Sequence, residues 1–320
     1  MKTTLFIYLF FSFLCSSQII SYELVKSWSL SDVQDMYNDN LLPSNVGQIN
    51  FEVDGYKILY FTPNHNGDLV LCSGAIYLPK GTICPSPLLS WQHGTTSYDL
   101  WAPSNVLSDN NVIGVVGASH GYIVTMSDFI GLGEGVGFHN YVHADTEATS
   151  TIDLILYGKE FAYDKGVMPS DQLFLFGYSQ GGHATMATVR EIENNPSLNL
   201  TISASAPMAG PYSMSGVMRE LMESGMPYPN PGYLPYVLFS YQNIYNLYDD
   251  ITEVLKLGKE VGVDEVRLKT AQVYDYKHGN ELIPTLDKYS RYYQKKEQDY
   301  LSNWLRPKWF ASYRHIWGGS

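Results

Sequence analysis

A hexapeptide near the middle of the chain has the residue types of a nucleophilic turn, Gly177-Tyr178-Ser179-Gln180-Gly181-Gly182. The apolar run 173–176 precedes it, and the run 184–189, typical of a helix, follows it. A strand-to-helix turn of this kind is so tight that side chains two residues before and after the serine would collide, and Gly177 and Gly181 avoid that collision. The helix N-terminus beside the serine hydroxyl favours developing negative charge. We therefore predict that Ser179 is a nucleophile, with a purely structural glycine turn as the alternative.

A second loop has residues suited to stabilising an oxyanion, because His93-Gly94-Thr95 follows the apolar stretch 88–91. A nucleophilic serine needs two main-chain N–H donors, one from the residue after it and one from the loop after an earlier strand. Gln180 is predicted to supply the first donor, and Thr95 or Gly94 the second. Gly94 allows close approach of the loop, and His93 is predicted to organise the loop through its ring nitrogens rather than to act in catalysis.

Other polar residues near these motifs are predicted to be structural. Asp128 follows an expected strand but precedes Ser179, whereas the acid of a serine triad on a strand–turn–helix scaffold follows the serine in the chain. It is therefore expected to fix a loop. His183 lies one helical turn past the serine, on the helix that would pack behind it. The glycines at 131, 133, 135 and 137 lack the spacing of a dinucleotide-binding loop.

These motifs lie on alternating elements. A short helical lead-in is expected over 21–45, and strands over 51–53, 57–61 and 69–78 would open the fold in antiparallel order around a turn at 66–68. From residue 88 onward, the expected strands are 88–91, 122–126, 173–176 and 201–206. Helices over about 110–120, from about 145 and after Ser179 separate them. This order predicts a mostly parallel sheet with helices on both faces.

From residue 213 onward no expected strand alternates with the helices. Helical stretches begin at Ser215 and recur near 241–256 and 286–305. We predict a helical cap over the sheet edge. The cap has a large share of the chain's 26 tyrosines, which either line an acyl-binding site or form the core of the cap.

The composition limits the class of protein. The chain has 320 residues, of which 45% are hydrophobic and 16% charged, as in ordinary globular domains. A formal charge of −12 argues against nucleic acid as a partner and against simple electrostatic docking on anionic membranes. No metal site is expected, because two cysteines without neighbouring histidines do not make one.

The N-terminus has the pattern of a secretory signal peptide. Lys2 precedes the apolar run 5–14, and the small residues at 15–17 would allow cleavage after Ser17. A buried first helix is one alternative; a lipoprotein anchor at Cys15 is a weaker one, because Leu14 is bulky where a small residue is expected. Secretion, to the extracellular space or to a vacuolar or periplasmic lumen, would allow Cys72 and Cys84 to form a disulfide, the alternative being two buried free thiols. Asn199-Leu200-Thr201 is a candidate glycosylation sequon.

Five ordered motifs together resemble the secretory lipase branch of the α/β-hydrolase superfamily. They are Trp91–Thr95, Ser127–Gly133, His139–Ala144, Gly177–Ala184 and Pro207–Tyr212. With the resemblance, an α/β-hydrolase core is expected over 18–212, between the signal peptide predicted over 1–17 and the helical cap predicted over 213–320. The resemblance also implies a lipase or esterase that acts on apolar acyl esters or lipids without a metal or an organic cofactor. A peptidase that cleaves small amides is an alternative on the same fold.

The general base and its acid are not identified by the sequence. Relatives carry both after later strands, whereas the histidines after Ser179 are His183, His278 and His315. Three interpretations remain. The sequence is a fragment without the last strands, or the protein is a catalytically incomplete binding protein, or a dyad uses His278 or His315.

Overall fold

The computed structural model describes residues 19–39, 48–107, 111–218, 220–221 and 233–249. Its centre is a seven-stranded sheet in the order β1-β2-β3-β5-β4-β6-β7. The strands are β1 (Ile19–Trp28), β2 (Val53–Pro63), β3 (Leu69–Pro79), β4 (Ser86–Gln92), β5 (Ile123–Ser127), β6 (Pro169–Tyr178) and β7 (Ile202–Met208).

The first three strands are antiparallel, and β3 also pairs with β5 in antiparallel register. A turn over 64–68 joins β2 to β3, in which the Asn64 N–H donates to the Asp68 carbonyl at 2.8 Å and Gly67 has φ 84°. Glycine adopts that left-handed conformation without steric cost. The predicted hairpin is therefore present, although 51–53 and 57–61 are not two strands: β2 runs unbroken from Val53.

The predicted helical lead-in is wrong over its first half. Residues 19–28 form β1, an edge strand paired with β2. Apolar residues at 20, 22 and 24 alternate with polar residues at 21 and 23, which is the period of a strand and not of a helix. The helix α1 (Leu30–Asp39) begins only afterwards. The Ser29 hydroxyl accepts from the Asp32 N–H at 3.2 Å, and the Asp32 carboxylate accepts from the Ser29 N–H at 2.8 Å. This reciprocal capping fixes the start of the helix.

The strands β5, β4, β6 and β7 are parallel to one another. The helices α2 (Val112–Ser119), α3 (Ala144–Asp164) and α4 (Gln180–Asn194) separate them in the chain, and a short 3-10 helix, η3 (Pro196–Leu198), precedes β7. The parallel strands therefore end at the same edge, where the Gln92–Thr95 loop, Asp128 and Ser179 follow β4, β5 and β6.

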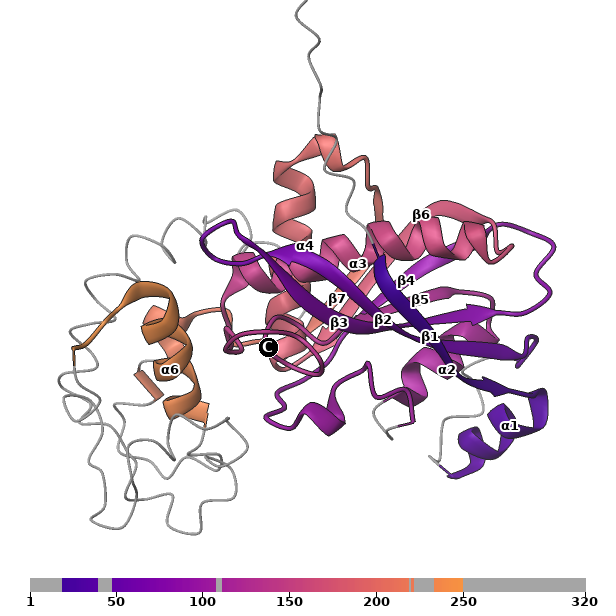
Figure 1. Ribbon diagram of the computed structural model, residues 1–320, viewed down its shortest axis with the longest axis horizontal. Helices are drawn as coiled ribbons and strands as arrows, with labels where there is room; N and C mark the ends of the chain where they lie inside the picture. The colour runs from indigo at the N-terminus through magenta and orange to yellow at the C-terminus, as the bar shows by residue number, and fades with distance from the viewer. Residues whose placement is uncertain (1–18, 40–47, 108–110, 219, 222–232, 250–320) are drawn as a thin grey trace, which may run out of the picture.

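Helices cover both faces of the sheet, as predicted (Figure 1). On one face, α3 and α4 bury a core that includes Ile152, Ile155 and Ile192. On the other face, α1 and α2 bury a second core that includes Val33, Val115 and Tyr77. These two cores hold the sheet between them, so the loops at its carboxyl edge have a rigid base.

The described part of the predicted cap contains a π-helical turn, η4 (Met214–Met218), and α6 (Tyr233–Tyr245). The helix α6 begins before the expected residue 241. Its buried tyrosines, Tyr236 and Tyr241, form a third cluster with Tyr141 and Val142 from the loop before α3. The cap's tyrosines thus contribute to its own core. The domain boundary at residue 212 stays a prediction, and residues 250–320, including the expected helix at 286–305, lie outside the described residues.

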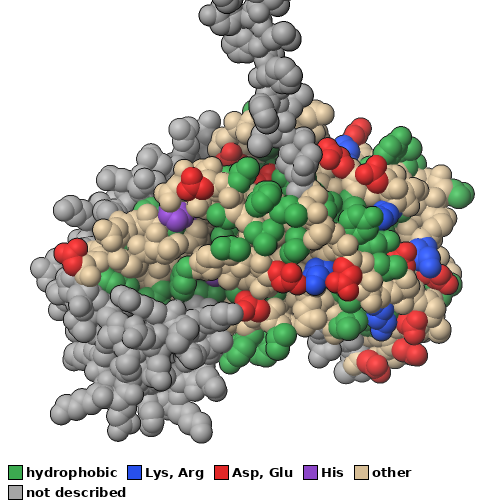
Figure 2. Space-filling model, viewed as in Figure 1, with side chains coloured by type: hydrophobic (Ala, Val, Ile, Leu, Met, Phe, Trp, Pro, Cys, Tyr) green, Lys and Arg blue, Asp and Glu red, His purple; other side chains and the backbone are tan. Residues whose placement is uncertain are grey.

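Hydrophobic side chains gather between the scattered charges on the face drawn in Figure 2. Exposed apolar residues on the edge strand β1 include Ile20, Tyr22 and Leu24. Among the described helices, none combines the length and the apolar character that a membrane span requires. The predicted signal peptide at 1–17 lies outside the described residues.

Candidate active site

Ser179 occupies a strained turn between β6 and α4. Its backbone has φ 58° and ψ −120°, which is rare for any residue other than glycine. A Cβ at Gly177 would lie 2.3 Å from the Gly181 carbonyl oxygen, and a Cβ at Gly181 would lie 1.8 Å from the Gln92 carbonyl oxygen. Only glycine fits at these two positions, for the steric reason expected from the sequence.

The turn is held in place by its neighbours. The Ser179 N–H donates to the Met208 carbonyl at the end of β7 at 2.9 Å. A Cβ at Gly182 would lie 2.2 Å from that same carbonyl oxygen, so a third glycine allows the close packing of α4 against β7. The serine is half-buried, which leaves its side chain at the surface of the turn.

Two loops meet at the serine. Gln180 is the first residue of α4, whose N-cap makes no side-chain capping hydrogen bond. The first N–H groups of a helix have no partner within the helix. On the other side, a Cβ on Gly94 would lie 3.8 Å from the Ser179 Cβ, so the 93–95 loop lies directly against the serine. The structure thus brings together Ser179, Gln180, Gly94 and Thr95.

The 93–95 loop is anchored through His93 and Asp128. The His93 Nδ1 lies 2.7 Å from the Gly94 carbonyl oxygen, and Nε2 lies 3.2 Å from the Asp128 carbonyl oxygen. The Asp128 carboxylate, fully buried, accepts from the Ser73 hydroxyl at 2.5 Å and from the Ser104 N–H at 2.7 Å. Burial raises the pKa of Asp128 to about 6. Both side chains bind loop segments and neither touches the serine hydroxyl.

A buried polar network lies beneath the turn, and the sequence had not pointed to most of it. The Gln180 side-chain Nε2 donates to the His139 Nε2 at 2.7 Å and to the Glu147 Oε1 at 2.9 Å. The other oxygen of Glu147 accepts from the His183 Nδ1 at 2.6 Å. His183 therefore faces the inside of the protein, where a structural role was expected.

The protonation of His139 is set by its surroundings. Its Nδ1 donates to the Ile130 carbonyl at 2.9 Å, which leaves Nε2 to accept from Gln180. Burial lowers the pKa of His139 to about 4, so the ring is neutral near pH 7. Burial also lowers the pKa of His93. The His139 ring therefore acts as a fixed neutral hydrogen-bonding group, which donates from Nδ1 and accepts at Nε2.

Aromatic rings cover the second loop. The Tyr141 and Tyr236 rings stack with centroids 4.3 Å apart and planes 6° apart. The Tyr141 hydroxyl lies 2.8 Å from the Thr95 Oγ1, and the Tyr236 hydroxyl donates to the Thr96 carbonyl at 3.1 Å. The helix α6 thus contacts the loop next to the serine and limits how far the loop can move.

The general base is not found beside the serine in the described ranges. No histidine there makes a hydrogen bond to the Ser179 hydroxyl. His278 and His315, the two candidates for a dyad, lie outside the described residues. No group of three His, Cys, Asp or Glu side chains in the described part of the chain is arranged to hold a metal ion.

The predicted pairing of Cys72 with Cys84 is not formed. Both are free thiols, Cys72 buried within β3 and Cys84 exposed in the loop before β4. Burial raises the pKa of Cys72 to about 12, because the thiolate would have little access to water. The alternative of two buried thiols holds for Cys72 alone.

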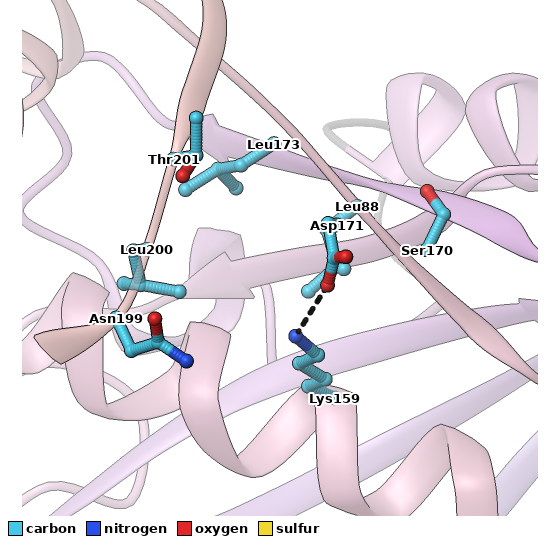
Figure 3. A pocket seen from close by; sticks show the side chains of 8 residues that line it. All are labelled: Leu88, Lys159, Ser170, Asp171, Leu173, Asn199, Leu200 and Thr201. Carbon is cyan, nitrogen blue, oxygen red and sulfur yellow. Dashed lines mark hydrogen bonds and ion pairs between the residues drawn. The ribbon is translucent and has the colours of Figure 1, made fainter.

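The sequon lies far from the serine, at the opposite ends of the strands. Asn199 is exposed and has a left-handed backbone, φ 51° and ψ 40°, directly after η3. Asn199 lines a hollow of about 200 Å³ together with Leu88, Leu200 and others, and Figure 3 shows these side chains. In this hollow the Lys159 Nζ lies 3.5 Å from the Asp171 Oδ1. A modification of Asn199 would not obstruct the serine.

Solved structures share this architecture, although the sequence matches no family model and no curated protein. A Legionella pneumophila protein assigned as a hydrolase superposes with a TM-score of 0.75 at 26% identity, over 88% of this chain and 78% of that one. The rice cell wall degrading esterase LipA from Xanthomonas oryzae superposes with a TM-score of 0.70 at 26% identity, over 85% of this chain and 71% of that one. Candida antarctica lipase A shares the fold, with a TM-score of 0.52 at 19% identity, over 78% of this chain and 53% of that one.

The fold is therefore the α/β-hydrolase fold, and the predicted fold class is confirmed. The structural neighbours are hydrolases, esterases and a lipase, in line with the predicted resemblance to the lipase branch. The site thus lies where parallel strands of such a sheet end, the usual position of active sites in open α/β folds.

Proposed function

We propose that the protein is a secreted serine hydrolase that cleaves carboxylic esters with apolar acyl groups through an acyl-enzyme on Ser179. The observation that supports this most is the left-handed Ser179 at a strand-to-helix turn, with the 93–95 loop lying against it. A backbone strain of this kind costs of order 1–3 kcal/mol and persists where the surroundings hold it in place. In a nucleophile elbow the strain presents the hydroxyl to the substrate.

In this mechanism the Ser179 Oγ attacks the ester carbonyl carbon, and a histidine base takes the hydroxyl proton. The carbonyl oxygen becomes an oxyanion, held by the main-chain N–H groups of Gln180 and Thr95. Collapse of the tetrahedral intermediate expels the alcohol, which receives the proton from the histidine. Water then attacks the acyl-enzyme by the same route and releases the acid. The names of the neighbouring esterase and lipase support an ester as the bond that is cleaved.

The test is turnover of p-nitrophenyl esters of graded acyl length by the purified protein. We expect hydrolysis that disappears in Ser179→Ala. The matched control is Ser203→Ala, at an exposed serine on β7, which should hydrolyse at the wild-type rate. Hydrolysis that survives in Ser179→Ala at the wild-type rate would exclude this mechanism.

A non-catalytic binding protein on the same fold is the second candidate. It is favoured by one observation, the lack of a hydrogen bond from any histidine of the described ranges to the Ser179 hydroxyl. It predicts cooperative unfolding and saturable binding of apolar esters, without turnover. Turnover lost in Ser179→Ala excludes it.

A further inference from the structure

The Glu147 carboxylate lies fully buried beneath the turn, in the first turn of α3. Its Oε1 accepts from the Val142 N–H at 3.1 Å and from the Gln180 Nε2 at 2.9 Å, and its Oε2 accepts from the His183 Nδ1 at 2.6 Å. Three donors therefore converge on two oxygens. An ionised carboxylate, which accepts and does not donate, suits this arrangement.

One of these bonds holds the residue after the serine. Both hydrogens of the Gln180 side-chain amide are used, one by Glu147 and one by the His139 Nε2. The side chain is fully buried, so residue 180 is fixed from inside the protein. Its main-chain N–H, at the start of α4, therefore has a fixed direction relative to Ser179.

A second bond holds the loop on the other side. Val142 has φ 58°, a strained conformation for a β-branched residue that its surroundings must maintain. The Glu147 carboxylate accepts from the N–H of this residue. The residue before it, Tyr141, makes the 2.8 Å contact with the Thr95 Oγ1. Glu147 is thus connected to the 93–95 loop through two adjacent residues.

We infer that Glu147 is a positioning residue that orients both oxyanion donors, Gln180 directly and Thr95 through Val142 and Tyr141. The inference rests on the proposed ester hydrolysis. Glu147 is buried and does not touch the substrate; its carboxylate determines where the two N–H groups point. Oxyanion stabilisation depends on donors placed before the reaction, so a small displacement of both donors should slow acylation.

The experiment compares Glu147→Gln with Asp153→Asn in the full chain. Glu147→Gln keeps the shape and removes the charge, so that an amide N–H faces donors that previously met a carboxylate oxygen. We expect kcat to fall by about 10²-fold, with KM changed less than about twofold. Asp153 is a partly buried carboxylate further along α3, and Asp153→Asn should keep the wild-type kcat. Thermal unfolding shows whether each variant is folded.

Gln180→Met removes the hydrogen bond between residues 180 and 147 by changing the donor instead of the acceptor, and it keeps the main-chain N–H of residue 180. This variant tests the inference if Glu147→Gln fails to fold. The double variant should be no slower than the slower single variant, because both changes remove one connection. Folded single variants with the wild-type kcat, or losses that multiply in the double variant, would overturn the inference. Absence of any Ser179-dependent turnover in the wild type would instead remove the proposed function, and this inference with it.

Discussion

The Tyr141 hydroxyl lies 2.8 Å from the Oγ1 of Thr95, so one aromatic side chain both stacks on α6 and holds the loop beside Ser179. Tyr141→Phe removes the hydroxyl and keeps the ring on Tyr236. We expect kcat for ester hydrolysis to fall about 10-fold, because the Thr95 N–H loses part of its support. The free energy of unfolding should fall by about 1 kcal/mol. Steady-state kinetics and urea unfolding measure the two effects.

The control for this change is Tyr157→Phe. The Tyr157 hydroxyl donates to the Phe61 carbonyl at 3.1 Å on β2, so its loss should lower stability by a similar amount and leave kcat unchanged. Equal kcat values in Tyr141→Phe and the wild type would show that Tyr141 does not support the loop.

Gly181→Ala should abolish the turn rather than merely weaken it. The added Cβ would lie 1.8 Å from the Gln92 carbonyl oxygen, which is main chain and cannot swing aside. We expect a loss of more than about 3 kcal/mol in the free energy of unfolding, together with loss of turnover. Gly67→Ala, where a Cβ meets nothing within 4 Å but φ is 84°, should lose only about 1 kcal/mol and keep its activity. A Gly181→Ala variant as stable and active as Gly67→Ala would refute the steric account.

The serine turn was predictable because its requirements are local. Glycines at 177 and 181 and the flanking apolar and helical runs all lie within a short stretch, and the steric reason is the one that the structure shows. The loop-fixing contacts of His93 were likewise suggested by its place after a strand. The parallel half of the sheet follows from strands that alternate with helices.

The rest depends on contacts between distant parts of the chain. The strand β1 is paired with β2, a partner that the alternation of apolar and polar residues at 20–24 does not identify. Glu147 is one of two acidic residues in the first turn of α3, where acidic side chains are usually solvated and favour the helix dipole. The neighbouring apolar residues Ala148, Ile152 and Ile155 have the spacing of a buried helix face, but that spacing does not itself place the Glu147 carboxylate inside.

The stability of the protein should fall on mild acidification, in part because of His139. Burial lowers its pKa from 6.5 to about 4 in the folded state, so the unfolded chain binds the proton first as the pH falls. The stabilisation is complete above about pH 6.5 and is lost as the pH falls toward 4, by up to about 3 kcal/mol. His139→Asn should have a lower free energy of unfolding than the wild type at pH 7, and the difference between the two proteins should be smaller at pH 4.5. Urea unfolding at both pH values measures this difference. A difference that does not change with pH would contradict the assignment to His139.

The proposed secretion and the candidate sequon predict the first residue and the modification of the mature protein. Expressed in a eukaryotic secretory host, the chain should begin at Gln18 and carry a glycan on Asn199, which is exposed on a turn. Enzymatic deglycosylation should reduce the mass of the wild-type protein. Thr201→Ala destroys the sequon, so the mass of that variant should not change on deglycosylation, whereas Thr201→Ser keeps the sequon and should lose mass as the wild type does. Retention in the cell with residues 1–17 attached, or a mass unaffected by deglycosylation, would contradict these proposals.

The role of Ser179 as the nucleophile is tested most directly with a fluorophosphonate probe, which forms a covalent bond only with an activated serine. We predict that one probe molecule attaches per chain, that peptide mapping places it on Ser179, and that Ser179→Ala is not labelled while Ser203→Ala is. An unlabelled wild-type protein with a cooperative unfolding transition, or a label on another serine, would contradict the account.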